Sequence, residues 1–145
     1  MGTAMSPAAV TPVTDELLKE IVQRIVAAFD VEAIILFGSH AYGEAREDSD
    51  VDLLIVTEAL SDLSVFQRHR AISELFSDRL FALDVIVRTR EELAQLCRQD
   101  PAFFGEIGMR GKVLYEQGRG TLGREGRGGL PDCAYPDAPA PASPA

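Results

Sequence analysis

The feature that most constrains the fold of this chain is a Gly-Ser pair followed, after ten residues, by two aspartates. Gly38-Ser39 ends the apolar run 33–37, and Asp50-Val51-Asp52 opens the apolar run 53–56. Apolar runs of this length, bounded by turn residues, are typical of buried strands. The order predicts strands over 33–37 and 51–56, joined through a turn that can approach a phosphate closely.

The carboxylates in this pattern predict a metal site. Side chains alternate along a strand, so Asp50 and Asp52 point to one face, with Cα atoms roughly 6.6 Å apart. At that spacing both can reach a pair of Mg²⁺ ions roughly 3.5–4 Å apart. A third carboxylate, Asp84, interrupts the apolar run 80–87, where an unpaired buried charge would be costly. We therefore expect Asp84 to be buried and to face a metal ion.

Each part of the pattern also has a simpler interpretation. Acidic chains produce Asp-x-Asp pairs by chance, and a Gly-Ser pair alone indicates only a turn that ends a strand. The residues from Asp48 to Asp52 also imitate the opening of a calcium-binding EF-hand loop. That loop needs Gly at its sixth position and Glu at its twelfth, where this chain has Leu53 and Ala59. The combination of turn, spacing and third aspartate therefore favours a two-metal site over calcium.

Other polar residues near the pattern carry weaker signals. Arg46 can offer charge to a triphosphate, although a solvated loop arginine is the simpler interpretation, and Ser49 more simply braces the loop. His40 follows the turn, and contact with a nucleotide is the less favoured interpretation of this residue. His69 is expected to pack on the face of a helix. Neither histidine has a Cys or His partner at zinc spacing. No base is oriented next to Ser39, so a Ser-His-Asp arrangement is not indicated.

The rest of the pattern alternates helices with strands. Thr14 is an expected N-cap for a helix that runs to Phe29, because apolar residues recur there at helical spacing. Further helices are expected to begin at residues 61–64, at Thr89 and at Asp100, and further strands at 80–87 and 113–115. We therefore predict an α/β fold, with a small mixed sheet of three to four strands flanked by helices.

Composition divides the chain into three parts. The sequence has 145 residues, room for one compact domain. Residues 1–13 are small and polar and are predicted to be a disordered N-terminus. Residues 14–117 are predicted to form the domain. Residues 118–145 hold six of the twelve glycines and five of the eight prolines, so a disordered tail is predicted there.

Charge and composition exclude several function classes. The net charge is −9, with 14 basic residues against 23 acidic ones, which argues against a protein that grips nucleic acid. No run approaches the roughly 18 apolar residues of a membrane span, and no secretory signal opens the chain. Two cysteines, Cys97 and Cys133, are too few for a disulfide framework and suit a reducing cytosol. We expect a cytoplasmic protein that binds neither nucleic acid nor membrane.

The segments 38–43 and 49–56 resemble the nucleotidyltransferase superfamily that includes DNA polymerase β. More narrowly, residues 14–117 resemble the minimal nucleotidyltransferase (MNT) family, and therefore the nucleotidyltransferase fold is expected. The resemblance implies two Mg²⁺ ions and ATP as substrate. By position, the metal-binding and catalytic roles fall on Asp50, Asp52 and Asp84, and the nucleotide-binding roles on Gly38 and Ser39.

The resemblance also implies a reaction and a partner. It implies transfer of AMP from ATP to a hydroxyl, with one metal ion on the triphosphate and leaving oxygen and the other on the acceptor. Asp84 would bind the second ion and could take the acceptor's proton. MNT proteins of the antitoxin type pair with HEPN-type ribonuclease toxins and modify a hydroxyl, typically of tyrosine. An acidic chain suits such a basic partner.

Two alternatives stay open at this point. One is a non-catalytic antitoxin that blocks a toxin by contact alone. The other is a small-molecule adenylyltransferase that works as a dimer, with the acceptor bound between subunits.

Overall fold

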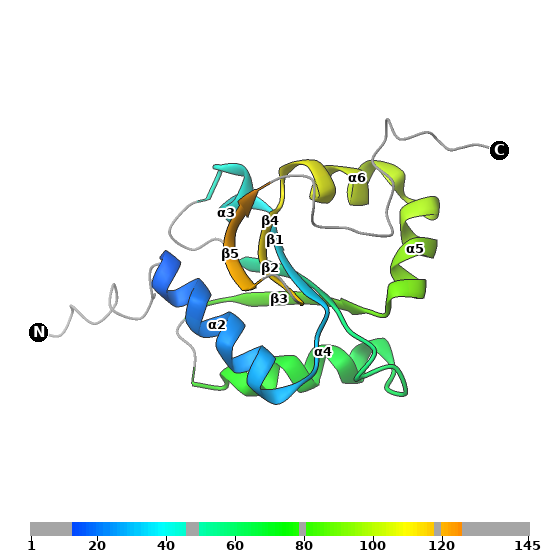
Figure 1. The fold of residues 1–145 in the computed structure, drawn as a ribbon, viewed down its shortest axis with the longest axis horizontal. Coiled ribbons are helices and arrows are strands. Elements are labelled where there is room, and N and C mark those ends of the chain that lie inside the picture. The colour runs from blue at the N-terminus through cyan, green and yellow to red at the C-terminus, as the bar shows by residue number, and fades with distance from the viewer. Residues whose placement is uncertain (1–12, 46–49, 79–80, 118–119, 126–145) are drawn as a thin grey trace, which may run out of the picture.

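A computed structural model describes residues 13–45, 50–78, 81–117 and 120–125. The described residues form a mixed α/β fold in which a sheet is flanked by helices (Figure 1). The elements in chain order are α2 (Asp15–Ala28), β1 (Ala33–Phe37), α3 (Ser39–Tyr42), β2 (Val51–Val56), α4 (Val65–Ser73), η2 (Glu74–Phe76), β3 (Leu83–Arg88), α5 (Arg90–Gln99), α6 (Pro101–Arg110), β4 (Lys112–Glu116) and β5 (Gly120–Glu125). The predicted fold class is confirmed.

The sheet has five strands in the order β3-β2-β1-β4-β5. Strands β2 and β3 are parallel, whereas β1 pairs antiparallel with both β2 and β4. The sheet is therefore mixed, as predicted, and β1 lies at its centre with all five residues buried. In this arrangement, the C-terminal end of β1 and the N-terminal ends of β2 and β3 meet at the same end of the sheet.

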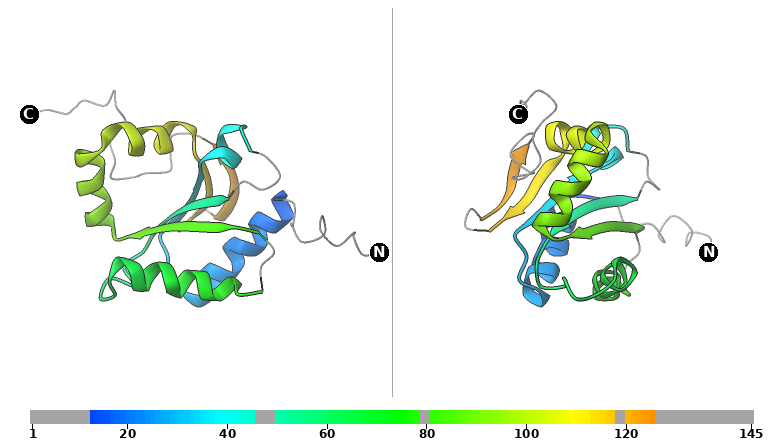
Figure 2. Two further views of the ribbon diagram at one scale, coloured as in Figure 1. Left: turned by 180° about the vertical axis from the view of Figure 1, so that it is seen from behind. Right: turned by 90° about the vertical axis from the view of Figure 1, so that its right-hand side faces the viewer.

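Helices cover both faces of the sheet (Figure 2). Alternation along each strand sends every second side chain to one of two apolar clusters. The cluster on the α2 and α4 side includes Ile21, Ile25, Leu53, Ile55 and Ile72. The cluster on the α5 and α6 side includes Ile35, Leu54, Leu93, Phe104 and Ile107. Each such side chain contributes about 1.5–3 kcal/mol when fully buried, so both layers hold the sheet in place.

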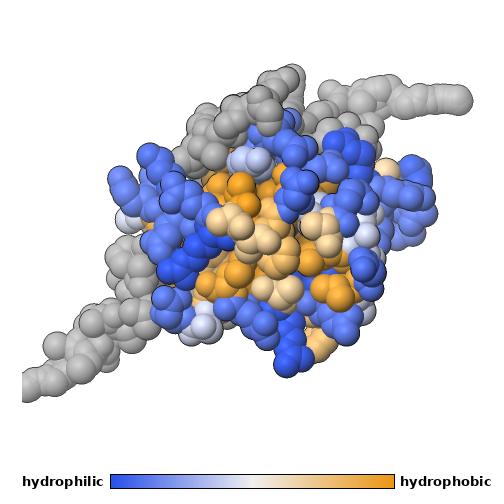
Figure 3. All heavy atoms as spheres, turned by 60° about the horizontal axis from the view of Figure 1, so that its bottom comes forward, coloured by the Kyte–Doolittle hydropathy of each residue, from blue (hydrophilic) through white to orange (hydrophobic). Residues whose placement is uncertain are grey.

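The α2 and α4 side leaves part of its apolar cluster at the surface. Seen from below Figure 1, apolar residues gather in the middle of this face and polar residues surround them (Figure 3). Partly buried side chains such as Leu17, Val26 and Leu75 pack against the buried cluster here. These side chains complete the core beneath α2 and α4.

The helix starts follow the capping chemistry predicted from the sequence. The Thr14 hydroxyl accepts a hydrogen bond from the Leu17 N–H at 3.1 Å, and Thr89 forms a capping box with Glu92. Asp100 caps α6, whose first residue is Pro101. These predicted caps are confirmed, and they fix where α2, α5 and α6 begin.

A buried arginine joins α4 to α5. The Arg68 side chain is only 5% exposed, and its guanidinium binds both carboxylate oxygens of Glu92, one of them at 3.1 Å. Its other donors reach the carbonyls of Leu63, Ser61 and Val87. The hydrogen bond from Arg68 lowers the pKa of Glu92 to about 2.

The sheet extends beyond the predicted domain end. We expected no structure after residue 117, but β5 pairs antiparallel with β4 over 120–125. An edge strand is held by backbone hydrogen bonds, which a glycine-rich composition does not reveal. Residues 126–145 and 1–12, where disorder is predicted, lie outside the described residues.

Two further expectations concern the cysteines and the membrane. Cys97 lies buried on α5 and is disulfide-bonded, which differs from the reduced state expected from the sequence. Cys133 lies outside the described residues. Within the described ranges, no helix has the length and apolar content needed to cross a bilayer.

Candidate active site

The Gly-Ser turn directly follows the central strand. Gly38 has φ +77° and is the N-cap of the single-turn helix α3, which begins at Ser39. Its carbonyl accepts hydrogen bonds from the N–H groups of Ala41 and Tyr42, both at 3.0 Å. A Cβ at position 38 would overlap Oδ2 of Asp52 and lie 3.0 Å from its Cγ. Only glycine fits here, because the backbone is left-handed and a carboxylate lies against it.

The strand register places the aspartates at one end of the sheet. Asp52 is paired with Phe37 of β1 on one side and with Asp84 of β3 on the other. Residues paired in this way have side chains on the same face, so Asp52 and Asp84 are cross-strand neighbours. Asp50 precedes β2 by one residue and lies two positions from Asp52. The structure therefore brings Gly38, Asp50, Asp52 and Asp84 to one place.

Electrostatics identify Asp52 as the centre of this carboxylate cluster. Its pKa is raised to about 6, first by burial and then by the negative charges of Asp84 and Asp50, while His40 acts in the opposite direction. Like charges this close are relieved by a divalent cation. Carboxylate oxygens are the ligands that Mg²⁺ prefers, so the donor set fits this ion.

The third aspartate differs from its prediction, because Asp84 is not buried. Its side chain is 61% exposed, and Oδ1 lies 3.5 Å from Nε2 of His69. The apolar run around it belongs to β3, an edge strand, so the charge reaches water. Burial therefore gives no reason for a metal at Asp84. Across the described ranges, no three His, Cys, Asp or Glu side chains converge in an arrangement ready to hold an ion. The aspartate side chains would have to rotate to share one metal ion.

Three residues near the site were not identified from the sequence. His69, predicted as packing, lies beside Asp84, and its Nδ1 is 3.5 Å from the Ser73 hydroxyl. Arg110 of α6 lies over the Tyr42 ring, with Cζ 4.4 Å from the ring centroid. Burial raises the pKa of Tyr42, and a hydrogen bond with the Gly38 backbone opposes that effect. The contact between α3 and α6 joins distant residues, and no local sequence signal indicates it.

Two weaker candidates from the sequence cannot be placed. Arg46 and Ser49 lie outside the described residues, between α3 and β2. Ser39 opens α3 directly beside Gly38, but no contact between Ser39 and the aspartates is found within the described parts of the chain.

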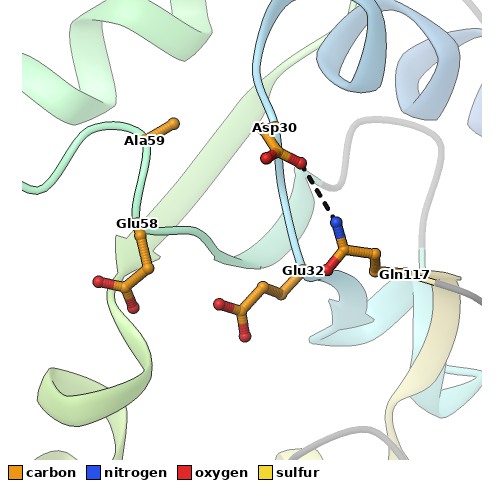
Figure 4. A pocket seen from close by; sticks show the side chains of 5 residues that line it. All are labelled: Asp30, Glu32, Glu58, Ala59 and Gln117. Carbon is orange, nitrogen blue, oxygen red and sulfur yellow. Dashed lines mark hydrogen bonds between the residues drawn. The ribbon is translucent and has the colours of Figure 1, made fainter.

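A pocket of about 280 Å³ lies at the opposite end of the sheet (Figure 4). It is lined by Asp30, Glu32, Glu58, Ala59 and Gln117. Its carboxylates already have protein partners. Asp30 accepts from the Gln117 side chain at 3.2 Å, Glu32 pairs with Arg90 at 2.6 Å, and Glu58 accepts from the Arg90 N–H at 3.0 Å. The pocket is therefore separate from the aspartate cluster.

The family model of the nucleotidyltransferase domain matches residues 16–105, more than half of the chain. The matched segment runs from α2 into α6 and spans the Gly-Ser turn and all three aspartates.

Individual proteins and structures resemble this chain at low sequence identity or over only part of its length. A protein of Methanocaldococcus jannaschii, named as a candidate protein adenylyltransferase, is 35% identical over 69 residues. The aligned part is 46% of this chain and 46% of that protein, so the chain spans about half the length of this curated relative. The crystal structure of a candidate nucleotidyltransferase from Sulfolobus solfataricus superposes with a TM-score of 0.54 and 25% identity, covering 74% of this chain and 85% of that chain. A toxin-antitoxin structure with AMP-PNP superposes with a TM-score of 0.43 and 17% identity, covering 70% of this chain and 75% of that chain.

Proposed function

The chain belongs to the nucleotidyltransferase domain family, and on that premise we propose that it transfers AMP from ATP to a hydroxyl of a partner protein. The observation that carries the proposal is the contact of Asp52 with Gly38 in a cluster with Asp50 and Asp84. A phosphate-sized turn and a set of carboxylates at one sheet end are the parts that phosphoryl-type transfer requires.

In the proposed reaction, Asp50, Asp52 and Asp84 would hold two Mg²⁺ ions. When bound, Mg²⁺ would neutralise charge on the triphosphate and lower the pKa of the acceptor hydroxyl. Gly38 and Ser39 bind the triphosphate through the turn before α3. The acceptor oxygen bonds to the α-phosphorus, the bond from that phosphorus to its bridging oxygen breaks, and pyrophosphate leaves. Asp84 takes the proton of the acceptor hydroxyl.

The exposure of the cluster supports a large acceptor. Asp50 is exposed, and the Asp84 side chain is 61% exposed, so a hydroxyl on another protein can reach them. The net charge of −9 is complementary to a basic partner. Together with the sequence resemblance to MNT antitoxins, these features support a HEPN-type ribonuclease toxin as the partner and a tyrosine hydroxyl as the acceptor.

One observation favours a second candidate. Because the described carboxylates are not arranged to hold an ion, the chain could act as an antitoxin that binds its toxin without catalysis. The two candidates differ in whether the partner gains mass.

Mass spectrometry of the product of the adjacent gene, co-expressed with this chain, tests the proposal. The partner should gain the mass of AMP with the wild-type chain. Asp84→Asn should slow the transfer by about 100-fold or more while still binding the partner. Asp62→Asn, which changes an exposed aspartate outside the cluster, should behave as wild type. Neutralisation of the partner by wild type and Asp84→Asn alike, without mass change, would establish the non-catalytic candidate instead.

A further inference from the structure

An aromatic pair lies beside the aspartate cluster. Phe37 is the last residue of β1 and is paired with Asp52, so its ring and that carboxylate share one face of the sheet. The ring of Phe103, from α6, packs edge-on against Phe37 with centroids 5.9 Å apart and an interplanar angle of 87°. Phe103 therefore packs directly against the residue that is paired with Asp52.

Phe103 is more exposed than the two aromatic rings that it packs against. Phe37 is 8% exposed and Phe104 is 5% exposed, whereas Phe103 is 39% exposed. Helices α5 and α6 bury the part of this face that carries Leu54 and Val56, and the face ends in the carboxylates of Asp52 and Asp84. Phe103 stands at the border between the covered part and the carboxylates. An aromatic ring left partly open at that border is positioned for a planar ligand.

Contacts at both ends of α6 hold Phe103 in position. Its N–H donates to the Asp100 side chain at 3.3 Å, which holds the first turn of α6. At the other end of α6, the Arg110 guanidinium lies over the Tyr42 ring of α3 and donates to the Tyr42 carbonyl at 3.4 Å. The Gly-Ser turn and the Phe103 ring are thus parts of one connected unit, and a ligand that spans both meets a prepared surface.

We propose that Phe103, supported by Phe37, is the surface on which the nucleotide base stacks. The inference rests on the proposed function, since it assumes that the triphosphate lies at Gly38 and the aspartates. Every base has a π-face, so stacking adds affinity without selecting one base. Phe103 therefore contributes similarly to ATP and GTP, and base selection lies with other groups.

Phe103→Leu tests this inference, because leucine keeps an apolar contact with Phe37 and removes the aromatic face. Titration calorimetry with Mg²⁺ should show ATP and GTP binding weakened by roughly 10-fold. Inorganic tripolyphosphate, which has no base, should bind within about twofold of wild type, and Phe103→Tyr should restore ATP affinity. Phe66→Leu is the matched control, because Phe66 is 71% exposed on α4, the helix that packs on the other face of the sheet.

The outcomes separate this inference from the proposed function. Unchanged ATP affinity in Phe103→Leu would overturn the stacking role while the proposed function stands. Equal weakening of ATP and tripolyphosphate would also overturn it, because the effect would then be a disturbed fold. Failure of the wild-type chain to bind ATP with Mg²⁺ would contradict the proposed function itself, and the stacking role with it.

Discussion

Single residues set the geometry of the candidate site, and Gly38 is the most restricted of them. It combines a positive φ with a close approach to the Asp52 carboxylate. Asp52 in turn has its pKa raised to about 6 by burial and by the other two aspartates. The Asp52 carboxylate therefore lies against the Gly38 backbone and close to two other negative charges. The folded chain tolerates this arrangement at a cost in stability.

Gly38→Ala should both destabilise the fold and displace Asp52. Gly43 gives a matched control, since its φ is +81° and a Cβ there would meet nothing within 4 Å. Gly43→Ala should cost about 1–2 kcal/mol for the left-handed backbone alone. Gly38→Ala should cost more in urea unfolding and should abolish Mg²⁺-dependent ATP binding, which Gly43→Ala retains. Equal losses in the two variants would show that the close contact with Asp52 is unimportant.

Asp52→Asn should stabilise the metal-free protein at neutral pH. The folded-state pKa of about 6 lies above the ordinary 3.8, so the stabilisation from protonated Asp52 is full below about pH 3.8 and is lost as pH rises through about 6. With EDTA at pH 7.5, the Asn variant should therefore be more stable than wild type by about 1 kcal/mol, because solvent screens the charges around this partly exposed carboxylate. The difference should vanish near pH 3.5. An Asn variant less stable than wild type at pH 7.5 would contradict this account of the cluster.

Among the elements, α4 and α5 depend on one polar joint beside β3. Arg68 is buried and reaches Glu92 and three backbone carbonyls, so one side chain ties together the loop before α4, the end of β3 and the start of α5. Removing it leaves the carbonyls without their donor and Glu92 without its cation. The joint acts on the fold and lies away from the aspartates.

Arg68→Met should destabilise the protein by about 3 kcal/mol in urea unfolding. Arg70→Met is the matched control on the same helix, because Arg70 and its partner Glu74 are 66% and 69% exposed, and it should cost at most about 0.5 kcal/mol. Glu92 has a lowered pKa, so its contribution is present above about 4.5 and lost as pH falls through about 2. The gap between wild type and Arg68→Met should shrink over that range. A gap that widens on acidification would count against the pair.

Elements defined by near neighbours in sequence are predictable, and those defined by distant contacts are not. The strands at 33–37 and 51–56 follow from apolar runs, and the caps at Thr14, Thr89 and Asp100 follow from local hydrogen bonding. The exposure of Asp84 depends on β3 being an edge strand, which periodicity does not encode. The contact between Tyr42 and Arg110 joins residues 68 positions apart, so it too depends on the completed fold.

At the scale of the whole molecule, the two ends of the sheet differ in character. One end gathers Gly38 and the three aspartates, with two of the carboxylates open to solvent. The other end has an acidic pocket whose side chains are satisfied by Arg90 and Gln117. In the described part of the chain, burial and the neighbouring carboxylates of the first end raise the pKa of Asp52, so under the proposed function the metal ions and the acceptor would meet there.

The role of the aspartates in binding metal and nucleotide is tested most directly by calorimetric titration of ATP with Mg²⁺ into wild type, Asp50→Asn and Asp52→Asn. Circular dichroism shows whether each variant is folded. We expect wild type to bind ATP only with the metal, and either substitution to abolish binding. Unchanged metal-dependent ATP binding in both folded variants would contradict the assignment of the site to these aspartates.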